Sequence, residues 1–518
     1  MSGKIARWGL LNAVRTVWNA GAIDTSHLGF RPIQKIATIP RQFGGPFGES
    51  RITPCRIRCA PVQEWARSRV GYWSVRYGRN KMTRWIGNIF PTKSDLSASP
   101  RLAIDGGPSA IKHPLPPMYP GGMRIGAEEE KAILDVLRSK RLFRYYGPYS
   151  GVSRVDEFEK AFAAYMGTGH AVAVSSGSAS LVCGLAALGV GPGDEVIVPA
   201  YTWIASAEAV IAVGAVPILA EIDQSLTLDV ADVESKITGR TKAIMPVHMR
   251  GAPCQMHRIV GLAQPRGLKV LEDVAQAAGG SFCGQRLGSI GDVGAFSFQF
   301  NKIITCGEGG IAITKNAELY QRIVMYHDVV GGLRNRIPKE KILNGLNFRM
   351  SELHGAIMLV QLRRLHGLLT DMRKRKAALK GAMQDVARRK GVSFRAINDA
   401  DGDTAISLVF FAPSAERAIR IAAALNAEGV SALVIYEPGR VDYHVYPHWT
   451  PVMEKRTWSE NGGPWRWHDG DVRYRRDMCP RSLDLLSRAV HLHISPDMNS
   501  VNVEELAGAV LKVLDALL

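Results

Sequence analysis

The chain of 518 residues lacks the patterns that mark several large protein classes. It contains no GxxxxGK(S/T) phosphate-binding loop and no HExxH zinc motif, which rules out two familiar kinds of site. Gly167-Thr168-Gly169 lacks the third glycine of a dinucleotide fingerprint. The longest uncharged, apolar-rich stretch, residues 209–220, is too short to cross a bilayer and contains Pro217. We therefore expect no membrane span.

Cysteine is also scarce. The seven cysteines are scattered, odd in number and contain no CxxC pair: Cys55, Cys59, Cys183, Cys254, Cys283, Cys306 and Cys479. This distribution argues against a disulfide framework and against a zinc site. We expect no metal, and a reducing cytoplasm as the natural setting.

Acidic residues are scarce in one region only. Residues 1–95 hold 16 Lys/Arg and 4 Asp/Glu, a balance of +12 within a net charge of +18. This basic N-terminal extension, residues 1–100, is compatible with a tail for nucleic acid or an anionic surface, a targeting peptide, a structured module, or a reading frame that truly starts at Met82 or Met118. We favour a disordered arm or an over-long reading frame, and we expect no nucleic-acid partner.

From Leu102 onward, short β-branched runs alternate with helical patterns. Helices are predicted at 128–139 and 155–166, and strands at 171–174, 195–198, 216–219, 243–247 and 270–271. Repeated alternation of strand and helix predicts an α/β fold with a mostly parallel sheet between helices. Such folds bind ligands at the carboxyl ends of their strands.

A long helical pattern begins near Ser351 and is the natural hinge between two domains. We predict a large α/β domain over residues 101–350, which would hold the ligand. A smaller C-terminal α+β domain follows over residues 351–518 and closes with a helix at 503–517.

Three segments together suit one cofactor. Ser175–Ser180 follows a strand and opens a helix, so its small residues and free amides suit a phosphate, although an ordinary helix cap has the same letters. Asp273 follows a buried strand, where it either projects into a site or caps a helix. Lys302 lies in an apolar strand-turn-strand segment, where its amine is costly to bury unless it is deprotonated, paired or covalently modified. A phosphate cradle, an acid for a pyridine nitrogen and a Schiff-base lysine are what pyridoxal 5′-phosphate (PLP) requires.

From about Leu102 to the C-terminus, the chain resembles the DegT/StrS family of sugar aminotransferases, which are fold type I PLP enzymes. The resemblance depends on the order and spacing of several motifs: Gly177-Ser178-Ala179, Gly193-Asp194-Glu195-Val196-Ile197, Tyr201-Thr202-Trp203, Thr241-Lys242-Ala243-Ile244, Pro246-Val247-His248, Glu272-Asp273-Val274-Ala275-Gln276, Phe296-Ser297-Phe298 with Lys302, and Asn347-Phe348-Arg349-Met350-Ser351-Glu352. No single motif is specific, but the set is.

The resemblance implies roles for individual residues around the cofactor ring. Lys302 would carry PLP as a Schiff base, and Asp273 would pair with the pyridine nitrogen. Gln276 would lie near the phenolic oxygen. Trp203 would stack on the ring, unless it is an ordinary core aromatic. His248 is either part of the site or a satisfied buried histidine.

The resemblance also implies a phosphate site and a dimer. Gly177, Ser178 and Ser297 would hold the phosphate, and Asn347 would reach the phosphate of the neighbouring subunit's cofactor. The chain would therefore form a homodimer with shared active sites. Ser178 stands where the family often has Thr, which keeps the hydroxyl.

The implied activity is transfer of an amino group from L-glutamate or L-glutamine to a nucleotide-linked keto sugar or a keto-cyclitol, by a ping-pong mechanism. Two alternatives stay open: a PLP-dependent dehydratase or lyase on the same scaffold, and a regulatory protein that has kept the fold. Lys302 argues against the dehydratases of this family, which carry histidine there. Residues 444–449 and 458–476, rich in Trp, Arg and His, are either a wall for the acceptor or a surface insertion.

Overall fold

The computed structural model describes residues 101–118, 124–145 and 153–518. These residues belong to one compact unit, Phe90–Leu518. The predictions made for residues 1–100 lie outside the described residues.

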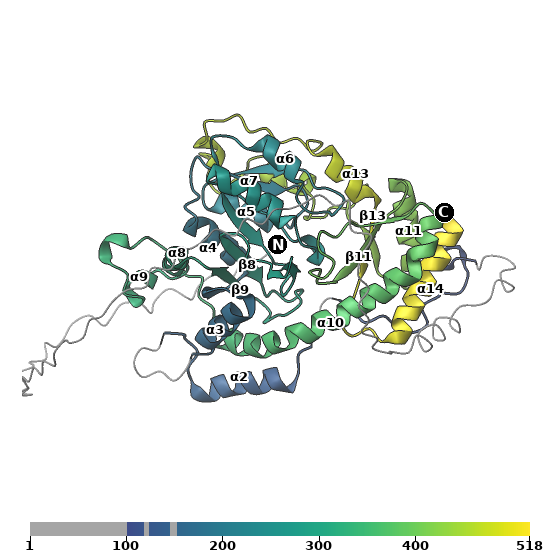
Figure 1. Cartoon of the computed structure of the whole chain (residues 1–518), viewed down its shortest axis with the longest axis horizontal. Helices are drawn as coiled ribbons and strands as arrows, with labels where there is room; N and C mark the ends of the chain where they lie inside the picture. Colours follow the sequence, from purple (N-terminus) through teal and green to yellow (C-terminus); the bar gives the residue numbers. More distant parts are fainter. Residues whose placement is uncertain (1–100, 119–123, 146–152) are drawn as a thin grey trace, which may run out of the picture. The chain divides into compact units, whose positions relative to one another are not determined.

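A seven-stranded sheet lies at the centre of this unit (Figure 1). Its strands follow the order β1-β9-β8-β5-β4-β2-β3, and only β9 runs antiparallel to its neighbours. Their bounds are β1 (His170–Val174), β2 (Glu195–Pro199), β3 (Val216–Ala220), β4 (Thr241–Ile244), β5 (Lys269–Asp273), β8 (Val293–Ser297) and β9 (Gly310–Thr314). The predicted α/β fold with a mostly parallel sheet is confirmed. The strand predicted at 243–247 is wrong at its end, because β4 stops at Ile244 and Val247 forms only an isolated bridge with Asp273.

Helices cover both faces of the sheet because successive strand residues point to opposite faces. Ala173 and Ile197 join the core that includes α3 (Arg154–Met166), α6 (Val230–Lys236) and α7 (Met256–Ala263). The alternate residues Val172 and Val198 join the core on the other face, with α4 (Gly177–Ala187), α5 (Ala205–Ala212) and α8 (Ala317–His327). Two apolar faces explain why the strands read as continuous β-branched runs.

The long helix predicted to begin near Ser351 is α10 (Glu352–Arg389). Ser351 caps it by accepting a hydrogen bond from the backbone N–H of His354. The helix is 38 residues long, which is about 57 Å at the usual rise per residue. It contacts α2 (Ala127–Ser139) and α3 along its first part and α14 (Ser500–Leu517) along its second (Figure 1).

A second, smaller sheet follows α10 in the chain. Its order is β10-β11-β13-β12, and all its pairs are antiparallel. The bounds of these elements are β10 (Ser393–Phe394), β11 (Ser407–Phe411), β12 (Ala432–Val434), β13 (Ala489–His493), α11 (Ala415–Ala427), α12 (Thr450–Met453) and α13 (Pro480–Arg488). Strands and helices together agree with the α+β character predicted here, and the predicted closing helix is α14. The boundary at residues 350 and 351 stays a prediction.

The first described residues lie against this C-terminal part of the chain. The backbone N–H groups of Ala103 and Ala110 donate to the Glu428 carboxylate at 2.8 and 2.7 Å, and Leu102 is buried. Lys512 of α14 also bonds Glu428, at 3.0 Å. One buried carboxylate therefore ties the segment after residue 101 to α14.

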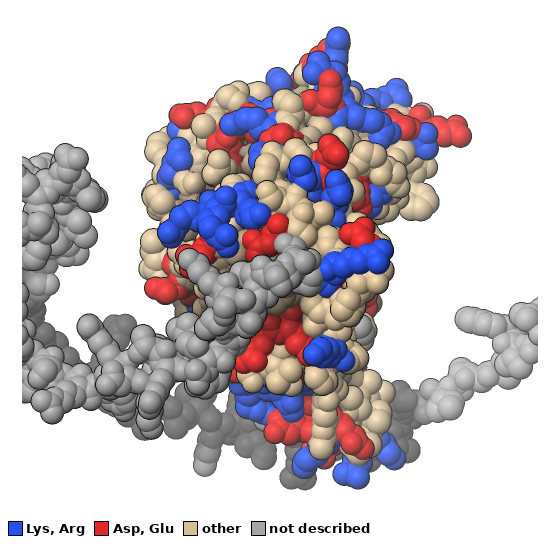
Figure 2. Space-filling model, turned by 90° about the vertical axis from the view of Figure 1, so that its right-hand side faces the viewer, with Lys and Arg blue, Asp and Glu red and all other residues tan. Residues whose placement is uncertain are grey.

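Charges of both signs are mixed on one face of the described residues. Figure 2 shows basic and acidic side chains next to each other on the face at the right-hand side of Figure 1. This agrees with the charge count, because residues 1–95 alone carry +12 of the net +18.

Candidate active site

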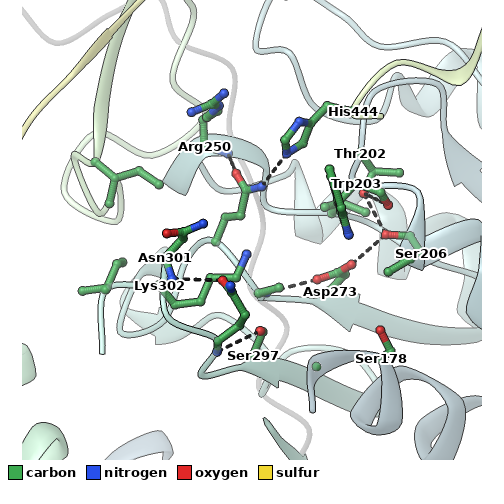
Figure 3. Close-up of a pocket in the computed structure, with 18 of the residues that line it drawn as sticks. Ser178, Thr202, Trp203, Ser206, Arg250, Asp273, Ser297, Asn301, Lys302 and His444 are labelled. Carbon is green, nitrogen blue, oxygen red and sulfur yellow. Dashed lines mark hydrogen bonds between the residues drawn. The ribbon is translucent and has the colours of Figure 1, made fainter. Parts of the chain in front are cut away.

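A cavity of about 620 Å³ lies at the carboxyl ends of the central strands (Figure 3). Asp273 is the last residue of β5, Ser297 is the last of β8, and Gly177 opens the helix after β1. All three line the cavity, together with Lys302. The cavity thus lies at the edge of the sheet where a ligand was expected to bind.

Lys302 lies in the turn segment between β8 and β9. Its backbone N–H donates to the carbonyl of Gln299 at 2.9 Å, and Phe298 pairs across the turn with the carbonyl of Gly309 at 2.8 Å. Burial lowers the pKa of the Lys302 ammonium below its usual 10.5, opposed by the carboxylate of Asp273. A lowered pKa increases the share of neutral amine, which is the nucleophilic form.

Asp273 is held by a chain of hydroxyl groups. Its Oδ2 accepts a hydrogen bond from Ser206 Oγ at 2.8 Å, and Ser206 contacts Thr202 Oγ1 at 2.7 Å. Its Oδ1 accepts from the backbone N–H of Ala275 at 3.0 Å. Burial raises the pKa of Asp273, while these donors and Lys302 lower it. Each oxygen keeps a second lone pair, so the carboxylate can accept an N–H from a ligand.

Three predicted phosphate ligands meet where α4 begins. Gly177 and Ser178 occupy its first two positions, whose backbone N–H groups have no partner within the helix. A Cβ on Gly177 would lie 2.6 Å from Cβ of Ser297 and 2.9 Å from its Oγ. Ser297 Oγ accepts from the backbone N–H of Gln299 at 3.3 Å, so its own proton is available to a ligand. This corner offers several donors in a small space, which suits a phosphate.

Trp203 and Gln276 also line the cavity. The Trp203 side chain is 47% exposed, so it is not the ordinary core aromatic that was the alternative. Its ring lies 4.9 Å from that of His444. Gln276 Oε1 accepts from the backbone N–H of Arg250 at 3.1 Å, and its Nε2 lies 3.5 Å from His444 Nε2. Both side chains are therefore held at the wall of the cavity, and Figure 3 shows Trp203 there.

Asn347 is the one predicted ligand that does not line this cavity. It is exposed, and its Oδ1 accepts only a long hydrogen bond, 3.4 Å, from the backbone N–H of Arg349. A role toward a second subunit's cofactor requires a side chain that points out of its own site, so that role stays a prediction.

His248 is a satisfied buried histidine. Its Nδ1 accepts from the backbone N–H of Cys254 at 3.1 Å, which leaves Nε2 to donate to Glu272 at 3.0 Å. Glu272 also accepts from the backbone N–H groups of Gly288, Ile290 and Gly291 at 2.7–2.8 Å. Glu272 thus serves the fold, while its neighbour Asp273 faces the cavity. Glu308 also lines the cavity.

Sequence reasoning missed several residues of the cavity wall, among them Ser206, Arg250 and His493. Ser206 lies in an ordinary helix, so nothing in its local pattern marks it. Arg250 stands two residues after the Pro246-Val247-His248 motif, and its position was the only available signal. His491 and His493 are two residues apart on β13, so both side chains lie on the same face of the strand.

The two parts of the proposed acceptor wall are separated in the structure. His444 lines the cavity. Residues 458–476 do not, because His468 bonds Glu195 at 2.9 Å and Tyr474 bonds the carbonyl of Pro217 at 2.7 Å. Those partners lie at the amino ends of β2 and β3, the edge opposite the cavity. Residues 458–476 are a surface insertion there.

Within the residues described, no helix is long and apolar enough to cross a membrane. No group of three or more His, Cys, Asp or Glu side chains in the same ranges is arranged to hold a metal ion. Five cysteines fall in these ranges, and all five are free: Cys183, Cys254, Cys283, Cys306 and Cys479.

The model of the DegT/DnrJ/EryC1/StrS aminotransferase family matches residues 123–459. The chain therefore belongs to this family, as the motifs indicated. The match leaves out the basic extension and α14.

Relatives of known name support the same assignment. L-glutamine:2-deoxy-scyllo-inosose aminotransferase of Streptoalloteichus tenebrarius is 41% identical over 274 residues, 51% of this chain and 63% of the relative. GDP-perosamine synthase of Caulobacter vibrioides is 45% identical over 220 residues, 42% of this chain and 58% of the relative. Spore coat polysaccharide biosynthesis protein SpsC of Bacillus subtilis is 32% identical over 401 residues, 75% of this chain and 95% of the relative. The alignment thus spans less than two thirds of the first two relatives.

Solved structures share the fold. 3-Amino-5-hydroxybenzoic acid synthase has a TM-score of 0.65 at 26% identity, over 78% of this chain and 100% of the other. DesV of S. venezuelae, determined with a ketimine intermediate, has a TM-score of 0.62 at 30% identity, over 75% and 94%.

Proposed function

We propose that this protein is a PLP-dependent aminotransferase that moves an amino group from L-glutamine or L-glutamate to a keto sugar or keto-cyclitol. The observation that carries the proposal is one cavity lined by Lys302, Asp273 and the start of α4. These are the amine, the acid and the phosphate cradle that PLP chemistry needs.

The residues present fit PLP. Gly177 packs so closely against Ser297 that a Cβ would not fit between them, and a phosphate in the adjoining cavity would receive the amides of α4 and the Ser297 hydroxyl. Asp273, with a free lone pair on each oxygen, would hold the pyridine N–H. Trp203 would cover one face of the ring, and Gln276 would lie beside its phenolic oxygen. When bound, PLP supplies an electrophilic carbon for the donor's amine and a sink for electrons released at the donor's α-carbon.

Lys302 would act twice. As a neutral amine it would attach to the cofactor, and its lowered pKa favours that state. Once displaced by the donor, the same amine would take the proton from the donor's α-carbon and deliver it to C4′ of the cofactor, on the other side of the nitrogen. Asp273 would keep the pyridine nitrogen protonated throughout.

The names of relatives suggest the substrates. One relative is named for L-glutamine and 2-deoxy-scyllo-inosose, and another is named for making GDP-perosamine. Keto-cyclitols and keto sugars are thus the first acceptors to test, and L-glutamine is the first donor. The named relatives give no choice between the two acceptor classes, because each class occurs among them.

We also propose a homodimer with shared sites, in the cytoplasm. Large apolar side chains are exposed on consecutive segments just before Asn347: Val329, Val330, Leu333, Ile342, Leu343 and Leu346. Exposed apolar side chains in such number are typical of an interface. A partner docked there would meet Asn347, which the resemblance assigns to the neighbouring subunit's phosphate.

The free cysteines suit a reducing compartment.

Steady-state kinetics with isotope-labelled donor tests this function. The purified protein is supplied with L-glutamine labelled with ¹⁵N at the α-amino group and with 2-deoxy-scyllo-inosose or a nucleotide-linked 4-keto sugar. Label in the acceptor product, and parallel double-reciprocal lines, are expected for a ping-pong transfer. Loss of water from the sugar without ¹⁵N transfer would contradict the proposal and favour a dehydratase.

A further inference from the structure

Two buried hydroxyl groups of the cavity wall, on Ser206 and Thr202, form a chain that ends on Asp273. Both residues line the cavity, and they are 0% and 1% exposed. Thr202 Oγ1 lies 2.7 Å from Ser206 Oγ, which lies 2.8 Å from Asp273 Oδ2 (Figure 3). The two hydroxyls therefore belong to one hydrogen-bonded chain with the acid of the site.

The chain has one direction when Asp273 is ionised. A carboxylate can only accept hydrogen bonds, so Ser206 must donate its hydroxyl proton to Asp273. The Ser206 oxygen is then left to accept the proton of Thr202. The carbonyl of Trp203 is also near the Thr202 hydroxyl, but at a longer 3.4 Å. Hydrogen bonds that point the same way polarise one another, so Thr202 strengthens the bond from Ser206 to Asp273.

The turn that carries both hydroxyls is fixed by a distant part of the chain. The backbone N–H of Thr202 donates to the carbonyl of His444 at 3.0 Å. The backbone N–H of Ile204 donates to the carbonyl of Tyr443, also at 3.0 Å. Ser206 follows in the first turn of α5. The two hydroxyl oxygens are thus held in position before any ligand binds.

Asp273 needs these donors because it is a buried acid, only 5% exposed. Burial raises its pKa above the usual 3.8, and hydrogen bonds from the Ala275 N–H and the Ser206 hydroxyl oppose this rise. The charges of Lys302 and His248, the ionisable groups that face it, act in the same direction as these hydrogen bonds. Loss of the Ser206 hydroxyl would therefore favour the protonated, neutral form of Asp273.

We propose that Ser206, supported by Thr202, is a positioning residue that keeps Asp273 ionised and directed at the pyridine nitrogen of the cofactor. The inference rests on the proposed aminotransferase function. An ionised Asp273 leaves the proton on that nitrogen, and a positively charged ring is the better acceptor of electrons. A more basic Asp273 would take this proton for itself and leave the nitrogen uncharged.

The test uses PLP that carries ¹⁵N in its pyridine ring, bound to the full-length protein. The ¹⁵N NMR shift of the ring reports whether the nitrogen is protonated, independently of turnover. In wild type near neutral pH, the shift should be that of a protonated pyridine. In Ser206→Ala it should move toward the shift of neutral pyridine, and Ser206→Thr, which keeps the hydroxyl, should restore it.

The rate of the donor half-reaction gives the magnitude. A hydrogen bond to a charged group changes an equilibrium by roughly 10- to 150-fold, so Ser206→Ala should lower the single-turnover rate with L-glutamine or L-glutamate by about 10- to 100-fold. Thr202→Val removes only the supporting hydroxyl and should lower this rate by about 2- to 10-fold, as expected for a bond between neutral groups. A merely structural role would lower stability but would not move the ¹⁵N shift.

Ser482→Ala is the matched control, because Ser482 is a buried serine that donates to a buried carboxylate, Glu221, outside the cavity. It should lower stability and leave the ¹⁵N shift unchanged. If Ser206→Ala does not fold, Thr202→Val replaces it, with Thr202→Ser as the variant that keeps the hydroxyl.

Two results would overturn the inference while leaving the proposed function intact. One is a wild-type ¹⁵N shift in Ser206→Ala, or in Thr202→Val where that variant replaces it. The other is a neutral pyridine in the PLP-loaded wild type. A wild type that takes up no PLP would instead refute the proposed function.

Discussion

Replacing Gly177 with alanine places a methyl group 2.6 Å from Cβ of Ser297 and 3.2 Å from its Cα. One contact is with backbone, so a simple rotation of the serine cannot relieve it. Alanine in place of glycine in a helix gains up to about 1 kcal/mol, whereas overpacking costs about 1–3 kcal/mol. The net effect on the apoprotein is a loss of roughly 0–3 kcal/mol in the free energy of unfolding.

The effect on cofactor binding should be larger. Moving Ser297 away from α4 removes one hydrogen bond to a charged phosphate, worth about 1.5–3 kcal/mol, or roughly 10- to 150-fold in the dissociation constant of PLP. Titration of apoprotein with PLP, followed by visible absorbance, measures this constant. Calorimetry or thermal unfolding of the apoprotein measures the stability.

A matched variant in the same helix separates an effect on phosphate binding from an effect on core packing. A Cβ on Gly184 would lie 2.5 Å from Cδ1 of Leu271, which is the far end of a side chain in the core. Gly184→Ala should therefore change stability without changing PLP affinity directly. If Gly177→Ala binds PLP within about twofold of wild type, the phosphate does not occupy this corner and the reasoning is refuted.

Further predictions concern the neighbours of Lys302 and the second subunit. The pH at which PLP attaches at half its maximal rate should lie below 10.5, because the pKa of Lys302 is lowered. Asp273 raises this pKa and Arg250 lowers it, so the midpoint should fall in Asp273→Asn and rise in Arg250→Gln. Equal midpoints in the three proteins would contradict the assignment. Glu272→Gln should cost about 3–5 kcal/mol of stability by removing a buried, fully bonded carboxylate, seen as a lower Tm, whereas Asp273→Asn should mainly lower kcat. Lys302→Ala and Asn347→Ala should each be inactive or weak alone. When the two variants are mixed as subunits, up to about a quarter of wild-type activity should return, because about half of the dimers are hybrids and one of the two sites in each hybrid is intact. No recovery in verified hybrids would count against shared sites.

The sequence predicted the sheet well because its strands are buried on both faces. Runs such as residues 195–198 and 216–219 are apolar throughout or nearly so, and both became strands with one added residue. The error at residues 243–247 has a local cause: Pro246 interrupts a run that is otherwise strand-like, and β4 stops two residues before it. The end of α10 was not predicted, because the second part of the helix is rich in Arg and Lys and resembles an exposed segment.

The sequence could predict only those cavity residues that lie in short motifs of adjacent residues. Lys302, Asp273 and Ser297 sit in recognisable segments, and the cavity brings them together. Ser206, Arg250 and His493 come from a helix, a turn and a distant strand, and only folding unites them. The part that Glu272 plays in the fold was not predicted either, since it depends on contacts with distant residues on the other face of β5.

The most direct test of the central claim is the visible absorption spectrum of the purified protein with PLP, wild type against Lys302→Ala, before and after L-glutamine or L-glutamate is added. If Lys302 carries PLP, the wild type should be yellow with an absorption band that a donor bleaches, and Lys302→Ala should have no such lysine-linked band. A wild type that stays colourless and takes up no added PLP would contradict the account and leave the fold to a binding or regulatory role.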